Sequence, residues 1–482
     1  MALYRPMHTR FLKAIFTASL LAVLPGKGLY AQSFNVDSAL SAMSIDEKIG
    51  QLFMVAAYSN KGEDHQAELE KLVRQYHIGG VITMQGGPER QKKLLHRLQS
   101  AAAFPLLVGQ DAEWGQAMRL DSTYKFPTSL TVGAAGGTMD AYDLGHALAD
   151  ECSAVGVHMS FSPVLDVNTN PNNPIIGARS FGSNPELVHA LGVALVEGIQ
   201  DRGVLACGKH FPGHGDTHQD SHKTLPKVER TLKELMEVEW VPFKGAIDAG
   251  VAAIMIAHLN IPSLEPSGKP TSLSHKVIQE ILRDQWGYEG IVITDALNMK
   301  GAAAFAPPGE LELAAFAAGN DILLFPMDVP KATKAFQNAL ATDKVSIKSL
   351  DERVRRILVA KSNCRAYTDW LEAKKSADPT LITSDHGSFE REDNNQRVSF
   401  NLIRNAATLL ETGSASFPIK NLEQNFLHIA IGDFESAGTV KQYLDRYKEM
   451  PHHHGVDVDD REMASKDAFV VSFHQNVKKQ YF

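Results

Sequence analysis

Short apolar runs alternate with longer amphipathic stretches from residue 50 to residue 330. The runs are nearly continuous in apolar residues, which is typical of strands in a parallel sheet that is buried on both faces. Eight such runs occur, at residues 52–57, 79–84, 105–111, 158–167, 204–211, 252–258, 290–296 and 321–326. The stretches between them, such as 140–156 and 184–203, have helical periodicity. Eight strand–helix units over this length predict an α/β fold, a (β/α)8 TIM barrel.

The competing arrangement is an open, doubly wound parallel sheet. Such a sheet usually carries a glycine-rich phosphate loop after its first strand, and no loop of this kind follows the first apolar run. Polar residues at the carboxyl ends of the runs also favour the barrel, because that rim is where TIM barrels place their active sites. The rim residues are Asp111, Asp166, Lys209, His210, His258 and Asp295.

The pattern changes after residue 345. Residues 346–364 predict one further amphipathic helix, and residues 366–400 are polar and mixed in character, as in a linker. Residues 401–482 predict two helices and two strands, which are too few to bury a sheet on both faces. We therefore expect a barrel domain at 32–365, a linker at 366–400, and an incomplete α/β domain, the start of a sandwich, at 401–482.

The amino terminus has the pattern of a secretory signal peptide. Arg5, Arg10 and Lys13 precede an apolar run at 14–24 that is too short to span a bilayer. We expect residues 1–31 to be removed. The mature protein would then be periplasmic or secreted, without stable membrane insertion.

Composition and charge narrow the choice of partners. The 482 residues carry a net charge of −8 and no basic tract, so a nucleic-acid partner is not expected. The three cysteines, Cys152, Cys207 and Cys364, have neither the number typical of a disulfide framework nor the spacing of a zinc site. We predict no cofactor and no metal, and we make no prediction of the oligomeric state.

A histidine-rich stretch follows the fifth apolar run. His210, His214, His218 and His222 recur at intervals of four, a spacing that could bind zinc on a helix. A proline and two glycines within the stretch prevent a continuous helix. We therefore interpret it as a catalytic loop, with a polar loop that has no chemical role as the alternative.

Three residues are candidates for catalysis. Asp295 ends the seventh run, where it could act as a nucleophile or base, or simply cap the helix that follows. Asp220 and His222 are separated by one residue, so the carboxylate could orient the imidazole for proton transfer. A solvated pair is the alternative. These residues alone indicate a barrel hydrolase that uses acid–base chemistry.

Four segments resemble a known family. The stretch KHFPGHGDTHQDSHKTLP (209–226) closely resembles the signature of glycoside hydrolase family 3, in its bacterial β-N-acetylglucosaminidase branch. Segments 110–119, 160–182 and 291–302 also match this family, and the resemblance covers roughly residues 40–365.

The resemblance implies an exo-acting, retaining enzyme that removes terminal N-acetylglucosamine from cell-wall or chitin-type oligosaccharides by double displacement. Asp295 would be the nucleophile, and His222 would be the acid/base, paired with Asp220. The residues that the resemblance assigns to the sugar hydroxyls are Asp111, Arg119, Arg179, Lys209 and His210.

The resemblance leaves other functions open. One is an N-acetylglucosaminide phosphorylase, because a neutral imidazole does not repel an incoming phosphate as a carboxylate would. Another is a β-glucosidase of the same family. A third is a sugar-binding protein without activity, which the intact Asp295, Asp220 and His222 disfavour.

Segment 110–119 departs from the family pattern. It has Ala112, Trp114, Gln116 and Met118 where cytosolic relatives commonly carry Gln, Gly, Arg and Gln. Asp111 and Arg119 keep their spacing. These changes predict an altered rim and a different aglycone preference.

Overall fold

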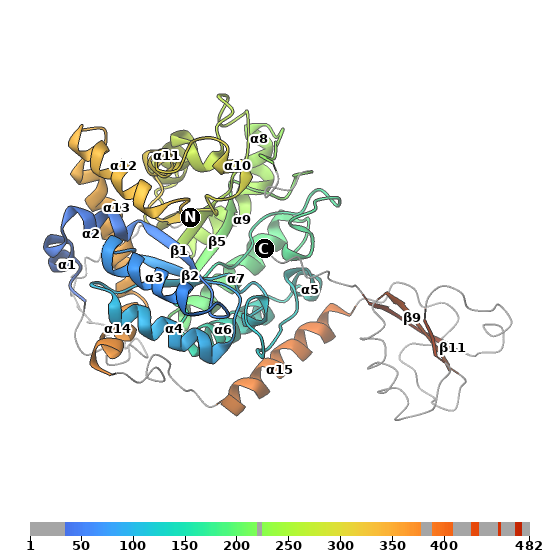
Figure 1. The fold of residues 1–482 in the computed structure, drawn as a ribbon. Helices are drawn as coiled ribbons and strands as arrows, with labels where there is room; N and C mark the ends of the chain where they lie inside the picture. The colour runs from blue at the N-terminus through green and yellow to red at the C-terminus, as the bar shows by residue number, and fades with distance from the viewer. Residues whose placement is uncertain are drawn as a thin grey trace, which may run out of the picture. The chain divides into compact units, whose positions relative to one another are not determined.

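A barrel of eight parallel strands forms the centre of the computed structural model (Figure 1). The structure describes residues 34–218, 224–376 and 388–407, with side chains from 391 in the last range, and the backbone of three strands between 426 and 474. The barrel strands are β1 (Phe53–Ala57), β2 (Gly80–Thr83), β3 (Leu107–Gln110), β4 (Met159–Ser160), β5 (Leu205–Phe211), β6 (Ala253–Ile256), β7 (Ile291–Thr294) and β8 (Leu323–Leu324).

The strands pair in the order β7-β6-β5-β4-β3-β2-β1-β8, and all of these pairs are parallel. A parallel bridge between Ile293 of β7 and Ile322, next to β8, closes the sheet on itself. Each strand lies within one of the eight predicted runs. The predicted TIM barrel is confirmed.

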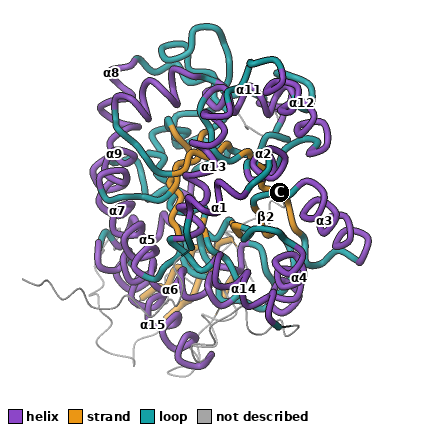
Figure 2. The backbone as a smooth tube through the Cα atoms, turned by 90° about the vertical axis from the view of Figure 1, so that its left-hand side faces the viewer, coloured by secondary structure: helices purple, strands orange, loops and turns teal. Residues whose placement is uncertain are grey.

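Helices surround the strands (Figure 2). They are α1 (Val36–Ala42), α2 (Ile45–Gln51), α3 (Glu63–Tyr76), α4 (Pro88–Ala101), α5 (Ser129–Ala135), α6 (Thr138–Ala154), α7 (Pro185–Asp201), α8 (Leu232–Glu234), α9 (Trp240–Asp248), α10 (Lys300–Ala303), α11 (Glu310–Ala318), α12 (Val329–Ala341), α13 (Ile347–Ser362), α14 (Ala366–Lys375) and α15 (Ser388–Ala406). Two π-helical segments, Leu235–Glu239 and Lys276–Gln285, and three short 3-10 turns, Gln116–Met118, Gly177–Arg179 and Thr271–Leu273, complete the described helical structure.

Helix α7 shows how the sequence specifies these elements. The Asn184 side chain caps the helix by accepting a hydrogen bond from the Leu187 N–H at 2.8 Å, and Pro185 occupies the first turn, where its missing donor costs nothing. Val188, Leu191 and Ile199 are buried and form the apolar face that packs on the barrel. The loop that precedes α7 is thereby fixed, and this loop carries Arg179.

Strand β4 is much shorter than its predicted run at 158–167. Only Met159 and Ser160 are in the strand, although the carbonyls of Ser162 and Pro163 still accept hydrogen bonds from Cys207 and Lys209 of β5. A bridge between Val164 and Lys209 continues the contact with β5. The rest of the run is buried, and it leads Asp166 into the rim of the barrel.

The predicted linker at 366–400 differs from the structure. It contains α14 and most of α15, and both helices pack on the barrel: Trp370 donates to the Ala102 carbonyl at 3.0 Å, and Asn395 donates to Glu151 at 2.9 Å. Leu402 of α15 is fully buried. The two helices are hard to recognise in the sequence because each one buries only a narrow stripe of its surface.

The chain divides into two compact units, Met1–Ala406 and Ala407–Phe482. In the second unit, β9 (Phe426–Gly432), β10 (His452–His454) and β11 (Ala468–His474) form a parallel sheet in the order β10-β9-β11. Strands β9 and β11 correspond to the two predicted strands, whereas β10 is a third strand that the sequence analysis did not predict.

The predicted signal peptide, residues 1–31, lies outside the described residues. Within the described part of the chain, no helix has both the length and the apolar character needed to cross a membrane.

Candidate active site

The predicted rim residues meet at the carboxyl ends of the barrel strands. Asp111 directly follows β3 and Asp295 directly follows β7, while Lys209 and His210 lie near the end of β5. The carboxyl ends of parallel strands share one end of a barrel. The rim residues that the sequence singles out therefore lie at one end of the barrel.

A chain of alternating charges joins the connections after β3 and β4 to Lys209, near the end of β5. Asp111 accepts from Arg119 at 2.5 Å and from Lys209 at 2.8 Å. Lys209 lies 2.7 Å from Glu113, and Arg179 binds the two oxygens of Glu113 at 2.7 and 2.9 Å. The Lys209 and Glu113 side chains are each only 2% exposed. This network is a rigid set of charged donors and acceptors.

The buried charges of this network stabilise one another. Burial would raise the pKa of Glu113, but Arg179 and Lys209 lower it to about 2. Burial would likewise raise the pKa of Asp111, but Lys209 and Arg119 hold it well below its ordinary value. Burial would lower the pKa of Lys209, yet the two carboxylates raise it. All three groups are therefore charged near neutral pH, as suits the binding of several hydroxyl groups.

Asp166 binds the start of the histidine-rich stretch through hydrogen bonds to its buried carboxylate. Its fully buried carboxylate accepts from His210 Nδ1 and from the backbone N–H of His214, both at 2.7 Å, and from the backbone N–H of His210 at 3.2 Å. His210 Nε2 accepts from Arg179 at 3.3 Å, because a guanidinium can only donate. The proton of His210 therefore sits on Nδ1, and the ring is held between a carboxylate and a cation.

Asp295 is a charged, partly exposed carboxylate next to two imidazoles. Burial would raise its pKa, but His210, His258 and the backbone N–H of Ala296 together lower it. The Ala296 N–H donates to Asp295 Oδ1 at 2.8 Å, and His258 Nε2 donates to the Ala296 carbonyl at 3.0 Å. Met299 occupies the N-cap position of helix α10, so Asp295 is not the cap of that helix. The arrangement leaves Asp295 suited to act as a nucleophile.

Asp220 and His222 lie outside the described residues, so their predicted pairing stays a prediction. The structure describes the chain on either side of them. Asn170 donates to the Thr217 carbonyl at 2.8 Å on one side. The Val228 N–H donates to the Asn260 carbonyl at 2.9 Å on the other.

Glu113 belongs to the candidate site but is not among the residues predicted from the sequence. It joins Lys209 to Arg179 and is almost completely buried. The available signal was its position two residues after Asp111, in a segment already assigned to the site. Nothing in a single sequence reveals that residues 113, 179 and 209 touch one another.

The departures in segment 110–119 do not all lie at the rim. Ala112 is fully buried, and Gln116 is buried and donates to Cys152 Sγ at 3.2 Å. Trp114 and Met118 are partly exposed. Any effect on the aglycone is therefore expected from Trp114 and Met118, and the prediction was too broad for the two buried residues.

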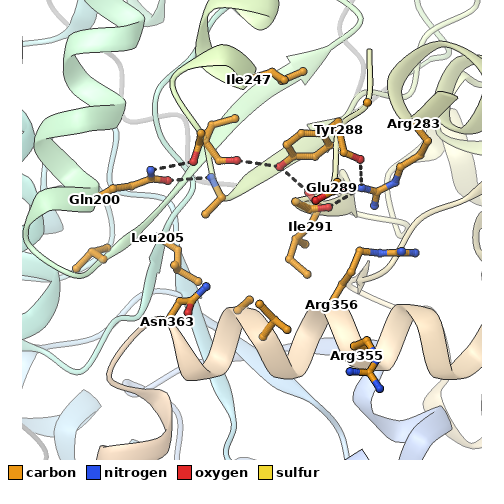
Figure 3. Close-up of a pocket in the computed structure, with 18 of the residues that line it drawn as sticks. Gln200, Leu205, Ile247, Arg283, Tyr288, Glu289, Ile291, Arg355, Arg356 and Asn363 are labelled. Atoms are coloured by element: carbon orange, nitrogen blue, oxygen red, sulfur yellow. Dashed lines mark hydrogen bonds between the residues drawn. The ribbon is translucent and has the colours of Figure 1, made fainter. Parts of the chain in front are cut away.

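A separate cavity of about 920 Å³ lies at the opposite end of the barrel (Figure 3). The residues that precede β5, β6 and β7 line it, together with one face of α13. Its polar groups make structural contacts: Gln200 bonds to the backbone of Gly250 and Ala252, and Arg283 binds Asp321 at 2.6 Å. Glu289 is the single carboxylate among its lining residues, which is too few for acid–base catalysis by paired carboxylates.

The charged and titratable residues of the candidate site that the structure describes therefore lie together at the carboxyl end of the barrel. Among the described residues, no cluster of His, Cys, Asp or Glu has the arrangement of a metal site.

Comparisons with known proteins show the family of this chain. Residues 44–360 match the "Glycosyl hydrolase family 3 N terminal domain". The chain is 30% identical over 415 residues to "Beta-hexosaminidase A" of Pseudoalteromonas piscicida, covering 79% of this chain and 67% of that protein. It is 28% identical over 429 residues to "Beta-N-acetylglucosaminidase/beta-glucosidase" of Cellulomonas fimi, covering 86% and 75%.

A solved structure is also similar. The family 3 β-N-acetylglucosaminidase from Paenibacillus sp. str. FPU-7 has 31% sequence identity and a TM-score of 0.72, covering 90% of this chain and 85% of that one. The family match spans all eight barrel strands and every described residue of the candidate site. This chain belongs to glycoside hydrolase family 3 and is a glycoside hydrolase.

Proposed function

We propose that this chain is an exo-acting, retaining β-N-acetylglucosaminidase. The observation that carries the proposal is the position of Asp295, a charged carboxylate at the end of β7 beside His210 and His258. The relatives named for β-hexosaminidase and β-N-acetylglucosaminidase activity support the sugar. The substrates would be terminal N-acetylglucosamine residues of cell-wall or chitin-type oligosaccharides.

The described network would bind the terminal sugar. Asp111 and Glu113 offer carboxylate acceptors, and Arg119, Arg179 and Lys209 offer charged donors, all fixed by the ion pairs around them. Charge-assisted hydrogen bonds to hydroxyl groups are stronger than neutral ones. Because the network is formed before the sugar arrives, little ordering cost opposes binding.

In the first step, an Asp295 oxygen attacks the anomeric carbon and the bond to the leaving oxygen breaks. His222 gives its proton to that oxygen, and a covalent glycosyl–enzyme forms. In the second step, His222 takes a proton from water, the water oxygen attacks the anomeric carbon, and the bond to Asp295 breaks. The anomeric configuration is retained because each step inverts it once.

A panel of 4-nitrophenyl β-glycosides, assayed with and without inorganic phosphate, tests the proposal. We expect the N-acetylglucosaminide to be cleaved fastest, with free N-acetylglucosamine as the product whether or not phosphate is present. The β-anomer should appear first by proton NMR. A sugar phosphate as the main product would identify a phosphorylase, and preference for the glucoside would identify a β-glucosidase. If no glycoside of the panel is cleaved, the result would indicate a sugar-binding protein without activity.

The amino-terminal sequence supports a further part of the proposal, a periplasmic or secreted location. Fractionation of cells that express the full chain should recover the mature protein outside the cytoplasm, shortened at its amino end. Recovery of full-length protein in the cytoplasm would contradict it.

A further inference from the structure

The chain that carries the proposed nucleophile is held at three consecutive residues. The backbone N–H groups of Asp295 and Leu297 each donate at 2.9 Å to a carbonyl of an adjoining strand, in β6 and β8 respectively. Between them, the Ala296 carbonyl accepts from His258 Nε2 at 3.0 Å. The two outer contacts are made by the backbone of the barrel, whereas the middle contact depends on the orientation of a side chain.

Ala296 links His258 to the carboxylate of Asp295. The N–H of Ala296 donates to Asp295 Oδ1 at 2.8 Å, while its carbonyl is the acceptor for His258. A change in the backbone angles of Ala296 would therefore move the donor that holds one oxygen of the carboxylate. A hydrogen bond to an ionised carboxylate is stronger than a neutral one, so this contact is well suited to fix the direction of Asp295.

The orientation of His258 depends in turn on Ser272. A carbonyl can only accept, so the proton of His258 lies on Nε2, which faces Ala296. Burial lowers the pKa of His258, so the ring is neutral and its Nδ1 accepts. The donor is the Ser272 hydroxyl, whose oxygen lies 2.6 Å from Nδ1. His258 is 1% exposed and Ser272 is fully buried, so this hydrogen bond is made in a place that favours a single arrangement of the ring.

Ser272 is itself held against the end of β6. The preceding residue, Thr271, donates through its N–H at 2.8 Å and through Oγ1 at 2.6 Å to the carbonyls of the two residues that flank His258. Asn320 Nδ2, just before β8, donates to the Ser272 carbonyl at 2.9 Å. The Ser272 hydroxyl therefore has a fixed place beside the imidazole.

We propose that Ser272 is a positioning residue for the nucleophile of this enzyme. Its hydroxyl fixes the tautomer and the ring of His258. His258 then holds Ala296, and the N–H of Ala296 holds the carboxylate of Asp295. Attack on the anomeric carbon requires close alignment, and a displacement of about 1 Å can lower a rate by roughly 10²-fold.

This inference rests on the proposed role of Asp295, and the assay separates the two. The variant is Ser272→Ala. The matched control is Ser100→Ala, which removes a hydroxyl that donates to the Ala373 carbonyl at 2.8 Å, between α4 and α14. Each protein is assayed on a dinitrophenyl N-acetylglucosaminide. The leaving group of this substrate needs no proton, so kcat/KM reports the attack by Asp295. The inhibition constant of free N-acetylglucosamine reports the binding of the sugar.

Ser272→Ala should lower kcat/KM on the dinitrophenyl glycoside by roughly 10-fold, because the carboxylate loses part of its alignment. The inhibition constant of N-acetylglucosamine should stay near the wild-type value, because the charged network around Lys209 is unchanged. Ser100→Ala should leave both values near those of the wild type. A serine that only stabilises the fold would instead lower the urea midpoint and leave kcat/KM of the folded enzyme unchanged.

A second pair of variants keeps the test open if Ser272→Ala does not fold. His258→Gln places an amide N–H near the position of Nε2 and can still donate to Ala296, whereas the side chain of His258→Asn is too short to reach it. His258→Gln should therefore keep more of the wild-type kcat/KM than His258→Asn.

Three results would overturn the inference: equal kcat/KM for His258→Gln and His258→Asn, equal kcat/KM for Ser272→Ala and Ser100→Ala, or a loss of sugar binding in Ser272→Ala that matches its loss of kcat/KM. If the wild type does not cleave the dinitrophenyl glycoside, the proposed function fails first. If the wild type cleaves it and Ser272→Ala behaves as Ser100→Ala does, only this inference fails.

Discussion

Asp166→Asn should damage both stability and catalysis. The carboxylate accepts three hydrogen bonds, from His210 Nδ1, the His210 N–H and the His214 N–H, in a place with no exposed side-chain area. Asparagine has nearly the same shape as aspartate, and its side-chain oxygen can still accept from the backbone N–H groups of His210 and His214. Its amide nitrogen would then face His210 Nδ1, which also carries a proton.

His210 cannot resolve this conflict by moving its proton. A proton on Nε2 would face Arg179 Nη2, which lies 3.3 Å away and can only donate. One charge-assisted hydrogen bond is therefore lost in either tautomer, and such a bond contributes about 1.5 to 3 kcal/mol. We expect the free energy of unfolding to fall by about 2 to 3 kcal/mol. A similar loss of transition-state binding would lower kcat/KM by roughly 30- to 150-fold.

Urea denaturation and steady-state assays on a 4-nitrophenyl N-acetylglucosaminide measure the two effects. The control is Asp46→Asn, an exposed carboxylate that accepts from Gln337 and should change stability by less than about 0.5 kcal/mol. If Asp166→Asn unfolds at the wild-type urea concentration, the buried hydrogen bonds do not contribute as described. If it is destabilised but keeps wild-type kcat/KM, His210 does not act in the reaction.

Three further predictions concern the site and its support. His222→Ala should lower cleavage of natural disaccharides by roughly 10²- to 10⁴-fold but spare dinitrophenyl glycosides, and added azide should restore turnover and give a β-glycosyl azide as the product. Asp220→Ala should show the same pattern more mildly. Equal losses on both substrates would contradict the pairing of Asp220 with His222. Glu113→Gln should raise KM more than it lowers kcat, because it leaves Lys209 and Arg179 with one charged partner fewer; unchanged KM would remove it from sugar binding. Burial raises the pKa of Glu239 to about 7, so the free energy of unfolding should fall by up to about 3 kcal/mol as the pH rises from about 4.5 to 7. Glu239→Gln should therefore flatten the fall in Tm between pH 5 and pH 8. An unchanged slope of Tm against pH would contradict the raised pKa of Glu239.

The barrel was predictable because its strands are buried on both faces and therefore stand out as apolar runs. The structure differs from the predicted elements in two places, the fourth strand and the predicted linker. The run at 158–167 forms a strand only at Met159 and Ser160, although its backbone stays hydrogen-bonded to β5 as far as Leu165. Helices α14 and α15 were interpreted as a linker because only a narrow stripe of each, with Leu402 as one member, is buried.

The sequence predicted which end of the barrel the described candidate residues occupy, but not the contacts between their side chains. Asp111, Lys209 and Asp295 were located by their positions at the ends of runs, and the structure brings them to one end of the barrel. Sequence spacing cannot show that Lys209 bridges Asp111 and Glu113, because the partners are about a hundred residues apart.

The identity of the nucleophile is the central claim, and covalent labelling tests it most directly. A 5-fluoro N-acetylglucosaminyl fluoride keeps the acetamido group and slows the second step, so the glycosyl–enzyme should accumulate. Digestion and tandem mass spectrometry should then find the sugar on Asp295, and Asp295→Ala should fold normally but carry no label and show no turnover. A label on any other carboxylate, or turnover by Asp295→Ala, would contradict the account.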